Sequence, residues 1–128
     1  MKQFIFWTGI YNILGGAGFV LGIWSLVGVK FPQSSFWAWG FGSALIYSGV
    51  VLVLCSRALP ARASLVYWEG LLRIVGFLLF AGFGFLGDFG VITGILGIVE
   101  LIIGLVYLIG LPKSFSVSAT DLLLDRAT

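Results

Sequence analysis

The sequence predicts an all-α integral membrane protein, in which four transmembrane helices form a bundle and little of the chain lies outside the bilayer. Of the 128 residues, 60% are hydrophobic and only 9% are charged, whereas a typical soluble domain has about 25% charged residues. Four stretches reach the ~20 mostly apolar residues that a spanning helix needs. The 19 glycines agree with this class, because small residues allow membrane helices to pack closely.

The four spans are expected at residues 4–29, 36–55, 65–86 and 91–111, and together they define a transmembrane domain over residues 1–111. Each span is bounded by residues that stop helices or form turns. These breaks are the turn 30–35 with Pro32, the loop 56–64 with Pro60, the turn Gly87-Asp88-Phe89-Gly90, and Pro112 after the last span.

The remaining residues, 112–128, are expected to form a short cytoplasmic tail. Ser118 is followed three residues later by Asp121 and then by three leucines, a pattern typical of a helix start. Such a helix is too short to be stable alone in water. We therefore expect it to be either disordered or docked on a partner or on the membrane surface, and the three leucines favour docking.

The distribution of Lys and Arg predicts that both termini are cytoplasmic, because cytoplasmic loops carry an excess of these residues. In a four-span protein the N-terminus, the second loop and the tail share one side of the membrane. That side would carry Lys2, Arg57, Arg62, Lys113 and Arg126, and the opposite side only Lys30.

The aromatic residues are expected at the two membrane interfaces or against lipid. Trp7, Tyr67, Trp68 and Tyr107 would lie near the inner interface, and Trp24, Trp37 and Trp39 near the outer one. Phe77, Phe80, Phe83 and Phe85 would face lipid.

The two halves of the chain share a weak internal repeat. Residues 7–15 align with residues 68–76, so that Asn12 matches Arg73. Glycines of the second and fourth spans align in the same order, Gly42 with Gly97 and Gly49 with Gly104. This order predicts a parallel duplication of a helical hairpin, with the two copies related by an axis along the membrane normal.

Three charged residues fall within the spans: Glu69, Arg73 and Glu100. A charge at mid-helix costs about 2.5–3.5 kcal/mol on insertion scales, so such residues face the bundle interior and pair. At ~1.5 Å per residue, Arg73 lies roughly 12 Å and Glu100 roughly 16 Å from the cytoplasmic ends of their helices. Asn12 falls at a depth similar to that of Arg73.

Two interpretations of this layer stay open. In the first, a small ligand or an ion binds between Glu69, Arg73, Glu100 and Asn12, and the lining includes Tyr47 and Ser48 from the second span. In the second, Arg73 forms a buried ion pair with Glu100 or Glu69 that fixes the helix register. Arg73 can neutralise only one carboxylate, so the other must be protonated, hydrated or matched by a ligand.

The composition removes most enzyme chemistry. The chain has no His and a single cysteine, Cys55, which excludes the commonest metal ligand, the usual general base and any intrachain disulfide. We therefore expect no metal, no cofactor and no catalytic residue. The formal net charge of +2 is small and scattered, so no nucleic-acid partner is expected.

Three short motifs resemble the DoxX-like group of small four-helix bacterial membrane proteins, over most of residues 4–111. They are Tyr11-Asn12 with Gly15-Gly16, then Ser56-Arg57-x-x-Pro60-x-Arg62, and Tyr67-Trp68-Glu69-Gly70. The resemblance implies a multi-pass protein of the bacterial inner membrane. In some members of the group the chain is the membrane subunit of a quinone-linked oxidoreductase; no catalytic residue is carried over to this sequence.

Three functions follow as hypotheses. The first is an accessory or structural subunit of a larger membrane complex, which would contact other subunits or further copies of itself. The second is an oligomeric small-solute or proton-coupled transporter that uses the buried Glu/Arg/Glu group. The third is a subunit of an oxidoreductase that binds quinone or lipid.

Overall fold

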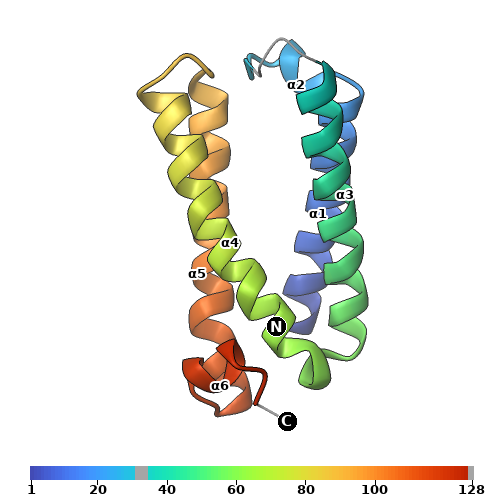
Figure 1. Cartoon of the computed structure of the whole chain (residues 1–128), viewed down its shortest axis with the longest axis vertical. Coiled ribbons are helices and arrows are strands. Elements are labelled where there is room, and N and C mark those ends of the chain that lie inside the picture. Colours follow the sequence, from blue (N-terminus) through green and yellow to red (C-terminus); the bar gives the residue numbers. More distant parts are fainter. Residues whose placement is uncertain (31–34, 127–128) are drawn as a thin grey trace.

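The computed structural model describes residues 1–30 and 35–126, and every regular element within them is an α-helix. This confirms the all-helical prediction. The elements are α1 (Lys2–Val20), α2 (Ile23–Leu26), α3 (Ser35–Arg57), α4 (Leu59–Phe85), α5 (Val91–Phe115) and α6 (Ala119–Leu123) (Figure 1).

Within the described residues, α3, α4 and α5 are long and apolar enough to cross a membrane. The first helix, α1, whose 19 residues include Lys2, Gln3 and Asn12, is not among them. Three helices therefore give the chain its membrane character.

The first predicted span ends earlier than expected. The sequence predicted residues 4–29, but α1 ends at Val20 and a separate short helix, α2, follows. The reason is Gly22, whose φ of 73° lies in the left-handed region that glycine adopts without steric cost and that commonly ends helices. Of the predicted turn 30–35, residues 31–34 lie outside the described residues.

Two prolines interrupt the helices less than predicted. The expected loop 56–64 is mostly helical, because Pro60 occupies the first turn of α4, where its missing N–H would have no partner anyway. The last long helix continues through Pro112 to Phe115, one turn beyond the predicted end, and stops where Ser116 is left-handed at φ 53°. The turn predicted at 87–90 does connect α4 to α5.

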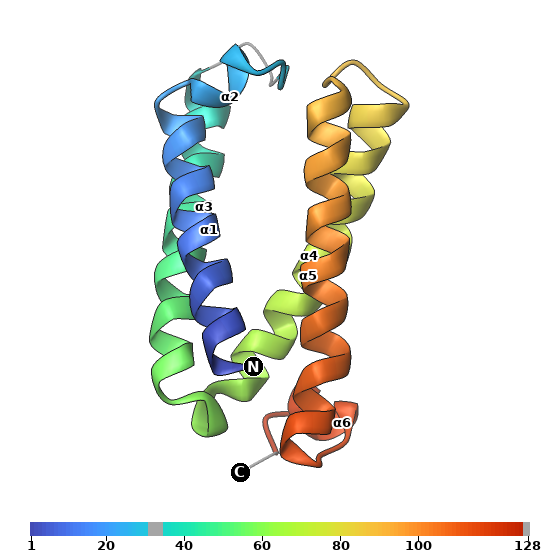
Figure 2. The ribbon, with the colours of Figure 1, turned by 180° about the vertical axis from the view of Figure 1, so that it is seen from behind.

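The long helices form two antiparallel hairpins, α1 with α3 and α4 with α5, which lie side by side (Figures 1 and 2). The start of α1, the α3–α4 connection and α6 share one end of the molecule, which we term the terminal end. The opposite end, with α2 and the α4–α5 turn, is the loop end. There the hairpins are linked by a hydrogen bond of 2.9 Å from the Lys30 N–H to the Phe89 carbonyl.

Glycines hold each hairpin together at aligned positions. A Cβ on Gly42 would lie 2.6 Å from the Gly16 carbonyl oxygen and 3.1 Å from the Val20 nitrogen. A Cβ on Gly97 would make the equivalent contacts in the second hairpin, with the Phe77 oxygen at 3.2 Å and the Ala81 nitrogen at 2.7 Å. Phe77 follows Gly16 by 61 residues, and Ala81 follows Val20 by 61, which is also the offset from Asn12 to Arg73. The two hairpins thus pack alike, as a duplicated hairpin would.

The hairpins meet at the terminal end in one buried cluster. Its fully buried members come from α1, α3, α4, α5 and α6, and include Ile5, Leu52, Val66, Tyr107, Leu111 and Leu122. Burying these side chains joins the two halves, since each fully buried large apolar side chain contributes about 1.5–3 kcal/mol.

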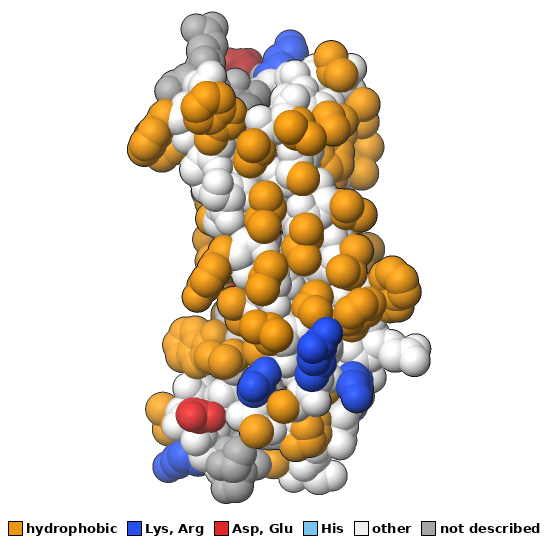
Figure 3. All heavy atoms as spheres, turned by 90° about the vertical axis from the view of Figure 1, so that its right-hand side faces the viewer, with side chains coloured by type: hydrophobic (Ala, Val, Ile, Leu, Met, Phe, Trp, Pro, Cys, Tyr) orange, Lys and Arg blue, Asp and Glu red, His pale blue; other side chains and the backbone are white. Residues whose placement is uncertain are grey.

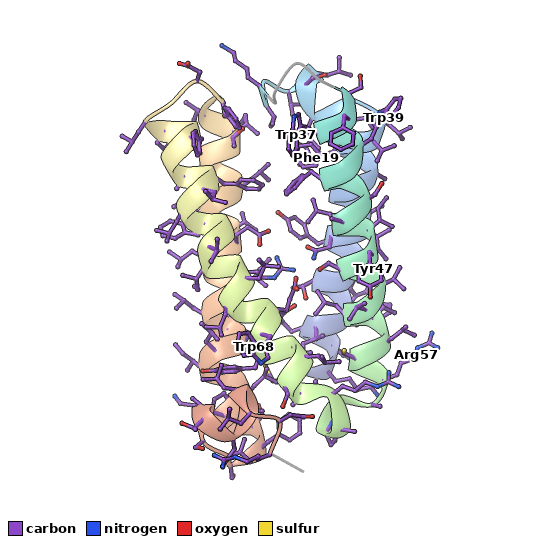
Figure 4. All side chains as sticks on the ribbon, viewed as in Figure 1. Phe19, Trp37, Trp39, Tyr47, Arg57 and Trp68 are labelled. Carbon is purple, nitrogen blue, oxygen red and sulfur yellow. The ribbon has the colours of Figure 1, made fainter. Side chains whose placement is uncertain are left out.

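The tail folds as predicted at its start but docks elsewhere. Ser118 Oγ accepts the Asp121 N–H at 3.1 Å, which confirms the predicted helix start. Leu122 is buried in the protein's own core, and Trp68 Nε1 donates to the Leu123 carbonyl at 3.1 Å. The helix therefore packs against the bundle, close to Trp68 in Figure 4, and not on the partner or membrane surface that we expected.

The outer surface is largely apolar. On the face drawn in Figure 3, hydrophobic side chains cover the middle of the molecule, and Lys and Arg gather toward the terminal end. Arg57, at that end of α3, points away from the bundle (Figure 4). This arrangement is typical of a protein whose central band contacts lipid.

Candidate functional site between the hairpins

A hydrogen-bonded network joins all four long helices near mid-height. Asn12 on α1 donates its amide N–H to Ser48 Oγ on α3 at 3.0 Å, and Ser48 Oγ donates to Glu69 Oε1 on α4 at 2.9 Å. Arg73 on α4 donates to Asn12 Oδ1 at 2.9 Å and to Glu100 Oε2 on α5 at 2.7 Å. We call these five residues the polar layer.

Arg73 is the centre of the polar layer. Its side chain is only 3% exposed, and it forms ion pairs with Glu100 at 2.7 Å and with Glu69 at 3.6 Å. Its guanidinium carbon also lies 5.7 Å from the centroid of the Tyr107 ring, within range of a cation–π contact. A guanidinium has five N–H donors, and the Nε donor has no partner among the described residues.

The polar layer forms one part of a cavity of about 240 Å³ between the hairpins, which we call the hairpin cavity. Its remaining wall is largely apolar and contains several aromatic rings. The residues of that wall include Phe19, Trp24, Phe41, Leu79, Phe80 and Leu96. Phe41 and Phe80 contact each other across the hairpins with ring centroids 5.7 Å apart. The cavity is therefore charged at the polar layer and largely apolar elsewhere.

Residues at aligned positions of the repeat line the hairpin cavity in pairs. Asn12 and Arg73 form one pair, and the same offset pairs Gly15 with Gly76. Further pairs are Tyr11 with Leu72, Phe19 with Phe80, Phe41 with Leu96 and Leu45 with Glu100. The cavity thus lies where an axis relating the two hairpins would pass, and Asn12 and Arg73 hydrogen-bond each other across it.

The structure brings most of the predicted site residues together. Asn12, Glu69, Arg73, Glu100 and Ser48 all line the hairpin cavity. Tyr47 does not: it is 72% exposed, and it lies at mid-height on α3 (Figure 4), one residue from Ser48. Neighbouring residues on a helix point about 100° apart, so Ser48 can face inward only if Tyr47 faces the side.

Sequence reasoning missed the contacts that three aromatic residues make inside the bundle. Trp24 was expected at the outer interface, but it lines the cavity and donates Nε1–H to the Gly15 carbonyl at 2.8 Å. Phe80 was expected to face lipid and instead contacts Phe41. Tyr107 was expected at the inner interface, but it is fully buried, with its hydroxyl hydrogen-bonded to Thr8. Only the alignment of Phe19 with Phe80 gave a signal that could have placed one of them.

The chemistry available in this cavity is binding and charge pairing. Within the described part of the chain, no group of three or more His, Cys, Asp or Glu side chains could hold a metal ion. The site contains a buried guanidinium, two carboxylates, an amide and a hydroxyl, next to the apolar part of the hairpin cavity. When the chain is compared with known proteins, no family model, curated protein or solved structure matches it.

Proposed function

We propose that the protein binds a small neutral amphiphile inside the membrane, with the ligand's polar end on the polar layer and its apolar body in the aromatic part of the hairpin cavity. The observation that carries the proposal is Arg73, a buried residue lining the cavity whose Nε–H has no partner among the described residues. Leaving a buried donor unsatisfied costs about 1–3 kcal/mol, and more for a charged group. A ligand oxygen would supply the missing acceptor.

The charges of the polar layer favour a neutral ligand. Glu69 and Glu100 share a single guanidinium, so the layer has no surplus positive charge to attract an anion. An ammonium group has only donors, so it cannot accept a hydrogen bond from Arg73 Nε. A carbonyl, amide or hydroxyl oxygen meets both conditions.

The apolar wall sets the length and size of the ligand. Phe80 follows Arg73 by seven residues on α4, which places it roughly 10 Å along the helix axis. The volume of about 240 Å³ is just below the ~300–1,000 Å³ of typical small-molecule pockets. The proposed occupant is therefore a small molecule or the head of a longer one, a description that includes the quinone or lipid expected from the sequence.

The test uses glycines that line the cavity and have room for a side chain. A Cβ on Gly76 would come no closer than 4.0 Å to any neighbouring atom, and a Cβ on Gly15 would meet nothing within 4 Å. Gly76→Leu and Gly15→Leu therefore add a side chain at the cavity wall whose Cβ makes no close contact. Gly82→Leu is the matched control, because Gly82 also has free space but does not line the cavity.

The probe is prodan, a neutral aromatic ketone whose emission shifts when its carbonyl accepts a hydrogen bond. In lipid nanodiscs we expect wild type and Gly82→Leu to bind prodan, and Gly76→Leu and Gly15→Leu to lose at least about tenfold in affinity, or ~1.4 kcal/mol. Unchanged binding by both cavity variants, or no saturable binding by the wild type, would contradict the proposal.

A second proposal is that the chain is a subunit of a larger membrane assembly. The observation that favours it is the row of large exposed aromatic side chains at the start of α3, Phe36, Trp37 and Trp39. Trp and Phe residues are enriched at protein interfaces. Purification in a mild detergent tests this directly: a co-purifying membrane protein supports it, and a single monodisperse chain at native expression level argues against it.

We also propose that α1 is a fourth crossing and that both termini are cytoplasmic. Nineteen residues of helix extend roughly 28 Å at 1.5 Å each, close to the ~30 Å of a hydrocarbon core. A Cβ on Gly49, in the span α3, would lie 2.5 Å from the Gly9 carbonyl oxygen, so α1 packs directly on a membrane-spanning helix. The Lys and Arg residues expected on one side do lie on the elements of the terminal end.

A further inference from the structure

A second cavity of about 270 Å³ lies between α3 and α4, and we call it the side groove. Ala44, Ser48, Glu69 and Leu72 line both the side groove and the hairpin cavity. The residues that belong to the side groove alone are Tyr47, Val51, Leu52, Cys55 and Leu65. Because the two cavities share these four lining residues, they lie next to each other, and the shared residues include the hydrogen-bonded pair Ser48 and Glu69.

The side groove opens on the surface that would face lipid. Tyr47 on α3 is 72% exposed, and on α4 Leu65 is 58% and Leu72 60% exposed. All three belong to helices that are long and apolar enough to span a membrane. The mouth of the groove therefore faces the hydrocarbon region of a bilayer and not the aqueous phase.

The contact between α3 and α4 is of the kind that can separate. Within each hairpin, glycines bring the two backbones together, as Gly16 does with Gly42 and Gly84 with Gly94. Between α3 and α4 no glycine makes such an approach in the described residues. Side chains connect the two helices at mid-height instead, through the Ser48–Glu69 hydrogen bond and the Phe41–Phe80 ring contact. Toward the terminal end they stay joined, because Arg62 donates to the Leu54 carbonyl at 2.6 Å and both helices contribute to the buried core.

The two ends of the bundle offer less room for passage. At the terminal end the fully buried core cluster fills the space between the hairpins. At the loop end a Cβ on Gly90 would clash with the Gly28 carbonyl, and the backbones of Lys30 and Phe89 are hydrogen-bonded at 2.9 Å. Trp24 adds its ring to the cavity wall on that side.

We infer that the ligand of the hairpin cavity enters and leaves sideways from the bilayer, between α3 and α4, through the side groove and past the Ser48–Glu69 hydrogen bond. The inference rests on the proposed function and adds its route and its source. A molecule that uses this route is lipid-soluble and is taken up from the membrane interior. It passes Tyr47, Leu65 and Leu72 at the mouth before its polar end reaches Arg73.

The test blocks the groove without changing the site. Leu65→Trp and Val51→Trp add bulk from α4 and from α3, at positions that line the side groove but not the hairpin cavity. Their matched controls are Leu78→Trp and Val50→Trp, which are exposed, lie on the same helices and line neither cavity. Each variant is placed in nanodiscs, and the exchange of prodan is followed by stopped flow through the emission of prodan itself.

For the groove variants we expect the association and dissociation rate constants of prodan to fall together by about tenfold or more, with little change in Kd, because a barrier on the route alters rates and not the bound state. The controls should exchange prodan at the wild-type rate. Wild-type rates in both groove variants would overturn the lateral route while leaving the proposed function intact. Failure of the wild type to bind prodan at all would instead overturn the proposed function, and this inference with it.

Discussion

At the scale of single residues, charge was the most informative property of the sequence. A charge inside a membrane must be paired, so Glu69, Arg73 and Glu100 could be assigned to the bundle interior from their positions alone, and the structure pairs Arg73 with both carboxylates. Ser48 could be proposed only as a possible lining residue, because serine is tolerated on either face of a membrane helix. Its place between Asn12 and Glu69 depends on how α3 rotates against α1, which residue type does not determine.

The ion pair between Arg73 and Glu100 gives a residue-scale prediction about stability. Removing one partner of a buried pair leaves the other charge uncompensated, at a cost of about 3–5 kcal/mol, whereas removing both is often far less harmful. We expect Arg73→Met to lower the free energy of unfolding strongly, and the double variant Arg73→Met with Glu100→Gln to recover part of that loss, because Glu69 still lacks the guanidinium but keeps its hydrogen bond from Ser48. Unfolding with SDS in mixed micelles, followed by tryptophan fluorescence, measures both.

Glu100→Gln alone completes the cycle, and Asp121→Asn, in a surface ion pair at 3.8 Å, is the control for loss of a carboxylate. An exposed pair contributes about 0–1 kcal/mol, so the control should change stability little. If the effects of the two single substitutions at 73 and 100 simply add, the pair is not the energetic unit described here.

At the scale of helices, hydropathy located α3, α4 and α5 but not their ends. Pro60 and Pro112 looked like breaks, and the structure places them inside helices, the first in an opening turn and the second in a closing one. Conversely, Gly22 lies in an apolar stretch and still ends α1 through its left-handed φ. Helix ends follow from backbone geometry and local hydrogen bonding, which a count of apolar residues does not contain.

Two adjacent glycines of α1 should respond in opposite ways to the same substitution. A Cβ on Gly16 would clash with the Gly42 carbonyl and lie 2.9 Å from the Ile46 nitrogen, whereas a Cβ on Gly15 meets nothing within 4 Å. We expect Gly16→Ala to destabilise the protein by about 1–3 kcal/mol through overpacking. Gly15→Ala should stabilise it by about 0.5–1 kcal/mol, because alanine favours the helix.

Thermal unfolding in the same detergent compares the two variants, and the neighbouring Gly15→Ala serves as the control for the loss of a glycine from α1. Equal effects would mean that α1 and α3 do not approach through Gly16. The sequence alone could not separate these residues, since the motif Gly15-Gly16 shows two small residues and not which of them faces α3.

At the scale of the whole molecule, the repeat predicts more of the architecture than its weak sequence match suggested. An offset of 61 residues relates α1 to α4, as in Asn12 and Arg73, and an offset of 55 relates α3 to α5, as in Gly42 and Gly97. The same two offsets pair residues across the hairpin cavity. The repeat did not predict that the charged residues of the site come from one hairpin only. Leu45 aligns with Glu100, and both line the cavity, so the charge that pairs with Arg73 comes from the second hairpin alone. Two similar hairpins can therefore enclose a site with one polar end.

The orientation of the molecule can be tested with cysteines at its two ends. In a Cys55→Ser background, Gln3→Cys and Ser114→Cys mark the terminal end, and Leu26→Cys, at an exposed residue of α2, marks the loop end. Because Lys and Arg gather at the terminal end, the positive-inside rule predicts that this end is cytoplasmic. A membrane-impermeant maleimide should label Leu26→Cys in right-side-out vesicles, and the other two only in inside-out vesicles.

The pair Gln3→Cys and Leu26→Cys decides whether α1 crosses the membrane, since these positions flank α1 directly. Labelling from opposite sides is expected, because an α1 packed against α3 along its glycines shares the depth of that span. Labelling of both from one side would leave three crossings, and the Asn12 end of the polar layer would then lie outside the bilayer. The Cys55→Ser background itself, which has no cysteine, reports nonspecific labelling.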